Sequence, residues 1–447
     1  MKKFLILIFL LIFSNAGAQK WQREMDSVLN LLAEKGLFDG QVFLAKKGQV
    51  HLNAAYGEME DQPERPKIMT TDAFQVHSVG KSMTAAGILL LVERGQLQLK
   101  DKLVKFFPET PYKNVTLEQL MSMTSGLPRF LPTALENGDT TKIMNSRELI
   151  ELVWKKAPEA GIPGENFFYN NANYYLLARI IEKQTKQDFG AFLRENIFEP
   201  LEMRNTYEGT SKDILALDGK KINADNFLQA SGAGSVYTTA EDLYKYDRAL
   251  KNNIFLPKQL KEKAFSEFRL NNGDLSNYGY GWRISRDSVG KEVYHVGDGL
   301  EMRAVLQRFI DEDRTLILLH AFSNEYSEAV YWVIRNIWEG KAYELPQKRE
   351  KYVVAPDLLE KYVGVYEGPN FGKIHISLNN GKLYLRPDPI PGKEELVPLS
   401  DTIFYFEGQN LEWQFYFDEQ GEVQAFGIKG SKEMKGFPIK KDPGSGN

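Results

Sequence analysis

The chain has 447 residues, a net charge of −4, 43% hydrophobic residues and no cysteine. The lack of cysteine excludes a disulfide framework, a thiolate nucleophile and a cysteine-based zinc site. Because the charge is small and spread along the chain, it does not indicate nucleic-acid binding. We expect a small-molecule or cell-wall-peptide-like substrate, no cofactor and no metal, while the oligomeric state stays open.

The N-terminus has the pattern of a secretory signal. Lys2 and Lys3 precede the apolar run Phe4–Phe13, and residues 16–18 are small. The apolar run is shorter than the about 20 residues that a membrane-spanning helix needs. We therefore predict a signal peptide over residues 1–18, export to the periplasm or out of the cell, and no membrane span in the mature chain.

Hydrophobic periodicity divides residues 19–345 into helices and strands. Helical spacing is found over residues 21–35, 78–94, 146–155, 173–183 and 325–338, and Thr116 with Gln119 forms a capping box for a further helix. Alternation predicts a hairpin of 41–46 and 49–56, and strands over 292–296, 303–310 and 315–322. This order predicts an α+β fold whose antiparallel sheet uses both ends of the domain, with a helical block inserted between them.

Beyond residue 345 the pattern changes. The charged segment 346–355 predicts a linker, and about eight short β-like runs over 356–441 predict a small β-barrel or meander. Aromatic residues alternate in these runs, at Phe404, Phe406, Trp413, Phe415 and Phe417. We interpret them as the core of this domain in preference to a ligand surface.

Residues 78–81 have the form Ser-x-x-Lys. In the first turn of a helix this spacing brings the Ser78 hydroxyl and the Lys81 ammonium to one face. The helix dipole there favours a serine alkoxide and a neutral lysine. Taken alone the motif is weak, because the same four letters recur at 288–291 and because an N-capping serine beside a surface lysine also fits.

The segment Tyr169-Asn170-Asn171 lies in a predicted loop before a helix. Tyr169 offers a phenol for proton transfer, and Asn171 offers an amide that binds both a carbonyl and an ammonium. The similar segment 112–114 shows that this motif is also unspecific, and a packed tyrosine beside an N-capping asparagine fits equally.

The segment His295-Val296-Gly297-Asp298 ends a predicted strand. His295 and Gly297 face the same side, so the imidazole offers a polar group and the glycine leaves room for substrate. The backbone amides of Asp298 and Ser78 are the expected oxyanion donors. The alternative for a lone histidine is a structural role.

The three motifs occur in a fixed order with further blocks. These are Val92–Leu97, Leu120–Pro128, Pro163–Glu165, Ala233–Leu243 and Tyr278–Trp282. The ordered set, over residues of about 22–340, resembles the class C β-lactamase-related serine hydrolase family. That family includes β-lactamases, D,D-peptidases, D-aminopeptidases and esterases. The C-terminal segment resembles the small β-barrel accessory domain of many relatives.

The resemblance implies a β-lactamase/transpeptidase-like fold and an acyl-serine mechanism. Ser78 is then the nucleophile, Lys81 activates it, Tyr169 passes protons, and Asn171 contacts the substrate. His295 stands where many relatives have lysine, which argues against efficient β-lactamase activity because imidazole is only partly cationic near neutral pH. We predict an exported serine hydrolase acting on an ester, amide or D-amino-acid-type substrate. The alternative is a catalytically weak, penicillin-binding-like envelope binding or sensing protein.

Overall fold

The computed structural model divides into two compact units, residues 1–323 and 324–447. It describes residues 20–58, 67–130, 144–209, 228–229, 231–287, 290–299, 302–321, 326–348, 352–368, 372–387, 393–406, 412–431 and 435–438. The predicted signal peptide over residues 1–18 lies outside these ranges. Within them, no helix combines the length and the apolar character that crossing a membrane requires.

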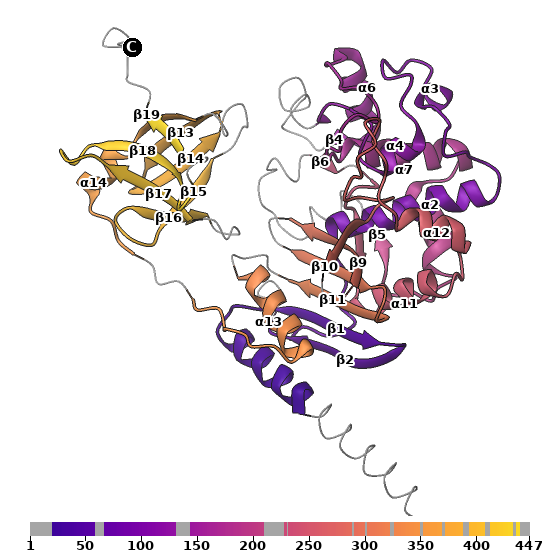
Figure 1. Cartoon of the computed structure of the whole chain (residues 1–447), viewed down its shortest axis with the longest axis horizontal. Helices are drawn as coiled ribbons and strands as arrows, with labels where there is room; N and C mark the ends of the chain where they lie inside the picture. The colour runs from indigo at the N-terminus through magenta and orange to yellow at the C-terminus, as the bar shows by residue number, and fades with distance from the viewer. Residues whose placement is uncertain are drawn as a thin grey trace, which may run out of the picture. The chain divides into compact units, whose positions relative to one another are not determined.

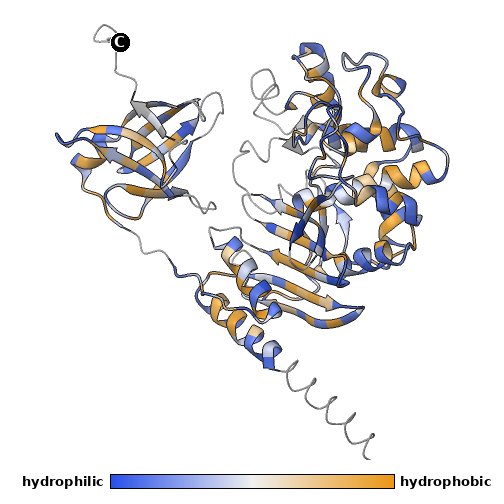
Figure 2. Cartoon of the chain, in the orientation of Figure 1, coloured by the Kyte–Doolittle hydropathy of each residue, from blue (hydrophilic) through white to orange (hydrophobic). Residues whose placement is uncertain are grey.

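An antiparallel sheet of six strands, in the order β2-β1-β11-β10-β9-β8, organises the first unit. Its strands are β1 (Gly40–Lys46), β2 (Gln49–Tyr56), β8 (Arg283–Asp287), β9 (Gly290–Asp298), β10 (Arg303–Phe309) and β11 (Arg314–His320). β1 pairs with β11 along its whole length, so strands from the two ends of the unit lie side by side (Figure 1). The central strands carry mostly hydrophobic residues (Figure 2). The predicted α+β fold is confirmed.

Helices fill the sequence between β2 and β8. They are α2 (Gly80–Glu93), α3 (Leu103–Phe106), α4 (Leu117–Met121), α6 (Ser146–Lys156), α7 (Ala172–Thr185), α8 (Phe189–Leu193), α11 (Ala240–Lys251) and α12 (Lys258–Ala264). A helix over 20–34 precedes β1. Short strands β3 (Phe74–Gln75), β5 (Tyr207–Glu208) and β7 (Val236–Thr238) form a small second sheet, and β4 (Met144–Asn145) pairs with β6 (Leu228–Gln229). The capping box of Thr116 and Gln119 is confirmed, although it opens a helix of only five residues.

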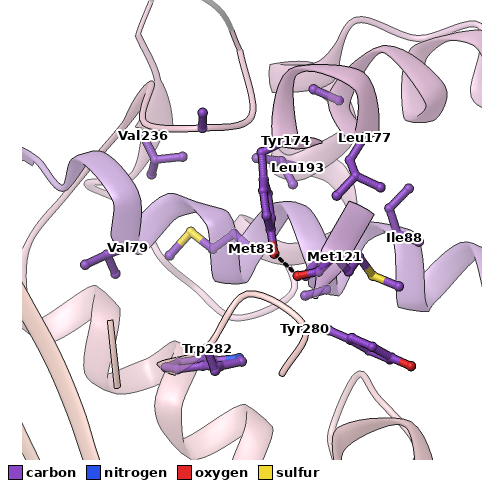
Figure 3. Close-up of a cluster of buried hydrophobic side chains, with 14 of the residues drawn as sticks. Val79, Met83, Ile88, Met121, Tyr174, Leu177, Leu193, Val236, Tyr280 and Trp282 are labelled. Atoms are coloured by element: carbon purple, nitrogen blue, oxygen red, sulfur yellow. Dashed lines mark hydrogen bonds between the residues drawn. The ribbon is translucent and has the colours of Figure 1, made fainter. Parts of the chain in front are cut away.

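Helix α2 lies inside the first unit and is buried on nearly all sides. Val79, Met83 and Ile88 pack against residues of α4, α7 and the segment before β8 (Figure 3). A helix that is apolar all round is buried in a core. The predicted helix start at Ser78 is wrong by two residues, since a 3-10 turn, η1 (His77–Val79), precedes α2. The beginning of α2 is therefore held rigidly within the core.

The second unit begins with α13 (Ser327–Glu339) and continues through α14 (Pro356–Lys361) into a closed barrel. The barrel strands are β12 (Gly364–Gly368), β13 (Gly372–Asn379), β14 (Lys382–Pro387), β15 (Glu394–Pro398), β16 (Ile403–Phe406), β17 (Glu412–Phe417), β18 (Val423–Ile428) and β19 (Lys435–Pro438). Phe404, Trp413 and Phe415 are buried inside it and the partly buried Phe417 packs against them, which confirms the interpretation of these four as core. The side chain of Phe406 lies outside the described residues.

A buried ion pair joins α11 to the sheet. Nε of Arg308 on β10 lies 2.5 Å from Oδ1 of Asp247, and both side chains are only 3% exposed. The hydroxyl of Thr315 on β11 donates to Asp247 Oδ2 at 2.7 Å. Since the partners of this carboxylate come from two strands, the pair ties α11 to the middle of the sheet.

We expect Arg308→Ala to lower the free energy of unfolding by about 1.5–3 kcal/mol, because it removes a buried, charged hydrogen-bond partner of Asp247, which keeps Arg248 at 2.8 Å. Urea unfolding measures the effect. Arg194→Ala is the control, because its pair with Glu199 is 57% and 66% exposed, and exposed pairs contribute about 0–1 kcal/mol. Equal effects of the two substitutions would contradict a structural role for the buried pair.

Candidate active site

Lys81 is fully buried and its ammonium points at Ser78. The Nζ atom donates to Ser78 Oγ at 2.8 Å and to the carbonyl oxygen of Ala233 at 2.5 Å. Burial, followed by the positive charge of Arg283, places the pKa of Lys81 well below its ordinary value. The alternative of a surface lysine is thereby excluded, and burial together with the charge of Arg283 favours the neutral amine.

The turn that carries Ser78 is held from two sides. Upstream, Val76 N–H donates to the carbonyl oxygen of Val236 at 2.9 Å, beside the pairing of β3 with β7. His77 has a φ of 43°, in the left-handed region that non-glycine residues rarely adopt. A strained residue directly before a nucleophile is typical of sites where the surrounding structure fixes a turn. Ser78 is half-buried there and remains accessible.

Strand β9 lies against this turn, and glycines permit the close approach. A Cβ atom added to Gly297 would stand 2.1 Å from the carbonyl oxygen of Val76. One added to Gly299 would stand 2.3 Å from the imidazole of His77. The expectation that Gly297 leaves room for substrate is therefore corrected: the chain's own backbone fills the space. Asp298 ends the strand, exposed, with Oδ1 3.3 Å from Nε of Arg303.

Tyr169 is positioned by the loop that follows α4. Phe168 N–H donates to the carbonyl oxygen of Met123 at 2.9 Å. The buried side chain of Asn170 donates to the carbonyl oxygens of Leu127 and Pro128 at 2.8 and 2.9 Å. Because the residues on both sides of Tyr169 are fixed in this way, the phenol is directed toward α2. Asn170 had no predicted role, because the spacing of two residues from Tyr169 selected Asn171.

The phenol of Tyr169 lies beside both Ser78 and Lys81. Lys81 Nζ lies 5.3 Å from the centre of its ring. Burial raises the pKa of Tyr169 to about 12, although a hydrogen bond with Ser78 and the charge of Arg283 act in the opposite direction. A hydroxyl, an amine and a protonated phenol therefore lie together. This set can remove a proton from a nucleophile and deliver one to a leaving group.

Asn171 is exposed at the start of α7. Its side chain does not cap the helix. The capping-type bond comes from Asn170, whose Oδ1 accepts from the N–H of Ala172 at 3.0 Å, so the N-capping alternative applies to Asn170. The amide of Asn171 hydrogen-bonds with the hydroxyl of Tyr175. An exposed amide two residues from Tyr169 has the freedom to meet a ligand.

His295 lies on β9 with a side chain that is 0% exposed. Its Nε2 is 3.0 Å from the hydroxyl oxygen of Tyr278, and its Nδ1 is 2.9 Å from the carbonyl oxygen of Val296. Burial, followed by the charge of Lys81, holds the pKa of His295 well below its ordinary value. This shift disfavours the partly cationic imidazole expected from the sequence.

Arg283 on β8 was missed by the sequence analysis. It pairs across the sheet with Tyr294, the neighbour of His295, and its Cζ lies 5.1 Å from the centre of the Tyr169 ring. It makes no ion pair with any residue in the described ranges. The one available signal was its position directly after the block Tyr278–Trp282.

The competing copies of two motifs lie in other surroundings. The hydroxyl of Tyr112 donates to the carbonyl oxygen of Pro158 at 2.8 Å, away from the site. In the second Ser-x-x-Lys copy, Gly290 and Lys291 begin β9, while residues 288–289 lie outside the described ranges. Within those ranges, no group of three or more His, Asp or Glu side chains is placed to hold a metal ion.

Comparison with protein families gives two matches along the chain. Residues 26–331 match the Beta-lactamase family. Residues 348–440 match a domain of unknown function, DUF3471. Penicillin-binding protein 4* of Bacillus subtilis is 30% identical over 432 residues, which cover 90% of this chain and 95% of that protein. The likeness extends through both matched segments.

Solved structures share the fold at lower identity. The octameric penicillin-binding protein homologue from Pyrococcus abyssi superposes with a TM-score of 0.59 and 21% identity, covering 92% of this chain and 99% of that one. The D-amino acid amidase from Ochrobactrum anthropi SV3 gives a TM-score of 0.57 and 20% identity, over 71% of this chain and 98% of that one. These likenesses show a β-lactamase/transpeptidase-like fold.

Proposed function

Because this chain belongs to the beta-lactamase family of serine hydrolase-like proteins, we propose that it hydrolyses its substrate through an acyl-serine intermediate on Ser78. The observation that carries the proposal is the 2.8 Å contact between Ser78 Oγ and Nζ of the buried Lys81. A neutral amine at hydrogen-bond distance from a hydroxyl is the arrangement that activates a serine.

In the acylation step, the neutral Lys81 takes the hydroxyl proton as Ser78 Oγ attacks the acyl carbonyl carbon. The negative charge moves to the carbonyl oxygen, where the backbone amides of Ser78 and Asp298 are the proposed donors. The carbon–leaving-group bond then breaks, and the leaving group receives a proton through Tyr169. An ester remains on Ser78.

In the deacylation step, water attacks the acyl-serine carbonyl and loses a proton to the Tyr169–Lys81 pair. The bond to Ser78 Oγ breaks, the serine recovers its proton, and the acid leaves. Asn171 is proposed to contact the substrate amide. Gly297 is proposed to act indirectly, because it lets β9 approach the turn that carries Ser78.

We propose an ester, amide or D-amino-acid-type substrate. The relatives support this choice through their names, since one is a penicillin-binding protein and another is a D-amino acid amidase. The neutral His295 argues against efficient β-lactam hydrolysis. It also favours one alternative, a penicillin-binding-like envelope protein that acylates slowly and then binds or senses. Steady multiple turnover of any ester or D-amino-acid substrate would exclude that alternative.

A fluorophosphonate probe followed by intact-mass analysis tests the proposal. We expect the wild-type chain to gain the mass of one probe and Ser78→Ala to gain none. Ser82→Ala is the matched control, because its hydroxyl donates to the carbonyl oxygen of Val79 at 2.8 Å in the same buried helix, and it should label like wild type. An unlabelled wild type, or equal labelling of Ser78→Ala, would rule out the nucleophile.

We propose export by a signal peptide over residues 1–18 and a periplasmic or extracellular location. We also propose a hydrolase domain over 19–345, a linker over 346–355 and an accessory barrel over 356–441. The family matches at 26–331 and 348–440 support the two domains. The compact units divide earlier, after residue 323, so that α13 falls with the barrel.

A further inference from the structure

We infer that Arg283 on β8 supplies the positive charge of this site, while a hydrogen bond from Tyr278 holds His295 as a neutral positioning residue. The inference rests on the proposed function, because it concerns the same reaction. The positive charge of the site then comes from β8, and not from His295 on the neighbouring strand β9.

The hydrogen bonds of His295 determine its tautomer. The carbonyl oxygen of Val296 can only accept, so Nδ1, 2.9 Å away, carries a hydrogen. In a neutral ring Nε2 then has a lone pair, which accepts the hydroxyl of Tyr278 at 3.0 Å. Both ring nitrogens are thus engaged within the protein, and neither remains for the substrate.

Tyr174 shows what a cationic His295 would require. The hydroxyl of Tyr174 donates to the carbonyl oxygen of Met121 at 2.7 Å (Figure 3) and hydrogen-bonds with Tyr278. A protonated His295 would donate from Nε2 to Tyr278, whose hydrogen would then go to the oxygen of Tyr174. Since this would leave a buried positive charge beside Arg283, the neutral arrangement is the more stable one.

The surroundings of His295 also oppose a positive charge. The titratable or charged side chains that face it are Lys81 of α2, Tyr169 before α7, and Tyr278 and Arg283 around the start of β8. Its cross-strand partner on β10 is the apolar Leu306. Burial, the charge that Lys81 carries when protonated and the charge of Arg283 lower the pKa of His295, and only the hydrogen bond to Val296 raises it.

Arg283 has the position that the charge needs. Its guanidinium lies 5.1 Å from the centre of the Tyr169 ring, where a cation is attracted by the aromatic face. Its charge lowers the pKa of both Tyr169 and Lys81. Among the described residues it has no ion-pair partner. Arg283 therefore favours the neutral lysine that the reaction uses.

Nitrogen-15 NMR of the histidine-labelled full chain tests the role of Tyr278 without requiring turnover. His295→Gln identifies the His295 signals, which we expect to show one neutral Nδ1–H tautomer between about pH 5 and 8. Tyr278→Phe should keep this tautomer, because Val296 fixes the hydrogen on Nδ1, but should shift the Nε2 signal, because that nitrogen loses its hydrogen bond. Tyr280→Phe is the control from the same motif, because its hydroxyl contacts Glu118 at 3.4 Å. A wild-type His295 that becomes cationic in this range, or an Nε2 signal that is unchanged in Tyr278→Phe, overturns the assignment.

The pH dependence of kcat/KM tests Arg283. Removing its charge raises the pKa of Lys81, so the acid limb of Arg283→Gln should move to higher pH, and kcat/KM at neutral pH should fall roughly tenfold. Arg283→Lys should restore most of the profile. An unmoved acid limb in Arg283→Gln overturns the inference. If the wild type shows neither turnover nor labelling of Ser78, the proposed function fails instead, and the NMR result for His295 stands independently.

Discussion

Lys81→Met is expected to lower kcat/KM by about 10²–10⁴-fold, the usual contribution of a general base. Nζ of Lys81 is the one amine within hydrogen-bond distance of Ser78 Oγ in the described part of the site. Methionine fills the buried space of the lysine stem, so the loss of the amine is separated from the loss of packing. Lys81→Ala, which also leaves a cavity, should lose the same activity but be less stable.

The same substitution is expected to raise Tm while it lowers activity. Burial places the pKa of Lys81 well below the ordinary value of 10.5, so the unfolded chain binds more protons than the folded one between the two values. Wild-type stability therefore rises with pH in this window. The increase in Tm caused by Lys81→Met should be largest at low pH and should vanish above about pH 10.5. Scanning calorimetry across pH measures it, and a Tm below that of wild type at neutral pH would contradict an uncompensated buried amine.

The fold was predictable because its signals are local. The hairpin β1–β2 follows from alternating residues around Lys47 and Gly48, which adopt positive φ values of 52° and 81°. The pairing of β1 with β11 follows from the order of the elements. The hairpin at the start of the domain has a free edge, and the strands at the end of the domain can pair with it in the same antiparallel sheet. The closed barrel followed from short alternating runs in the same way.

The site was predictable only in part. The order of the motifs along the chain selected Ser78, Lys81 and Tyr169. The competing copies at 288–291 and 112–114 do not fit that order. The environments of these residues depend on tertiary contacts that no spacing encodes. The burial of Lys81, the contact of Gly297 with Val76 and the position of Arg283 beside Tyr169 all arise where β8 and β9 meet the turn before α2. No short sequence window contains two of Lys81, Tyr169, Arg283 and Gly297.

Tyr169→Phe is expected to lower kcat/KM to different extents for different substrates, depending on whether the leaving group needs a proton. Since burial raises the pKa of Tyr169 to about 12, the phenol is protonated at neutral pH and serves as a proton donor. A nitrophenolate departs without a proton, whereas an amine or an alkoxide needs one. We expect kcat/KM for an alkyl ester or an amide to fall by about 10²–10⁴-fold, and that for a nitrophenyl ester to fall far less.

Steady-state kinetics on a matched pair, a nitrophenyl ester and an alkyl ester of the same acid, measures this difference directly. Tyr175→Phe is the control, because it removes the neighbouring hydroxyl that bonds to Asn171 but does not contact Ser78. It should change both rates equally. An equal loss for the two esters in Tyr169→Phe would mean that the phenol only positions Ser78. The proton for the leaving group would then have to come from Lys81, which is protonated once it has activated the serine.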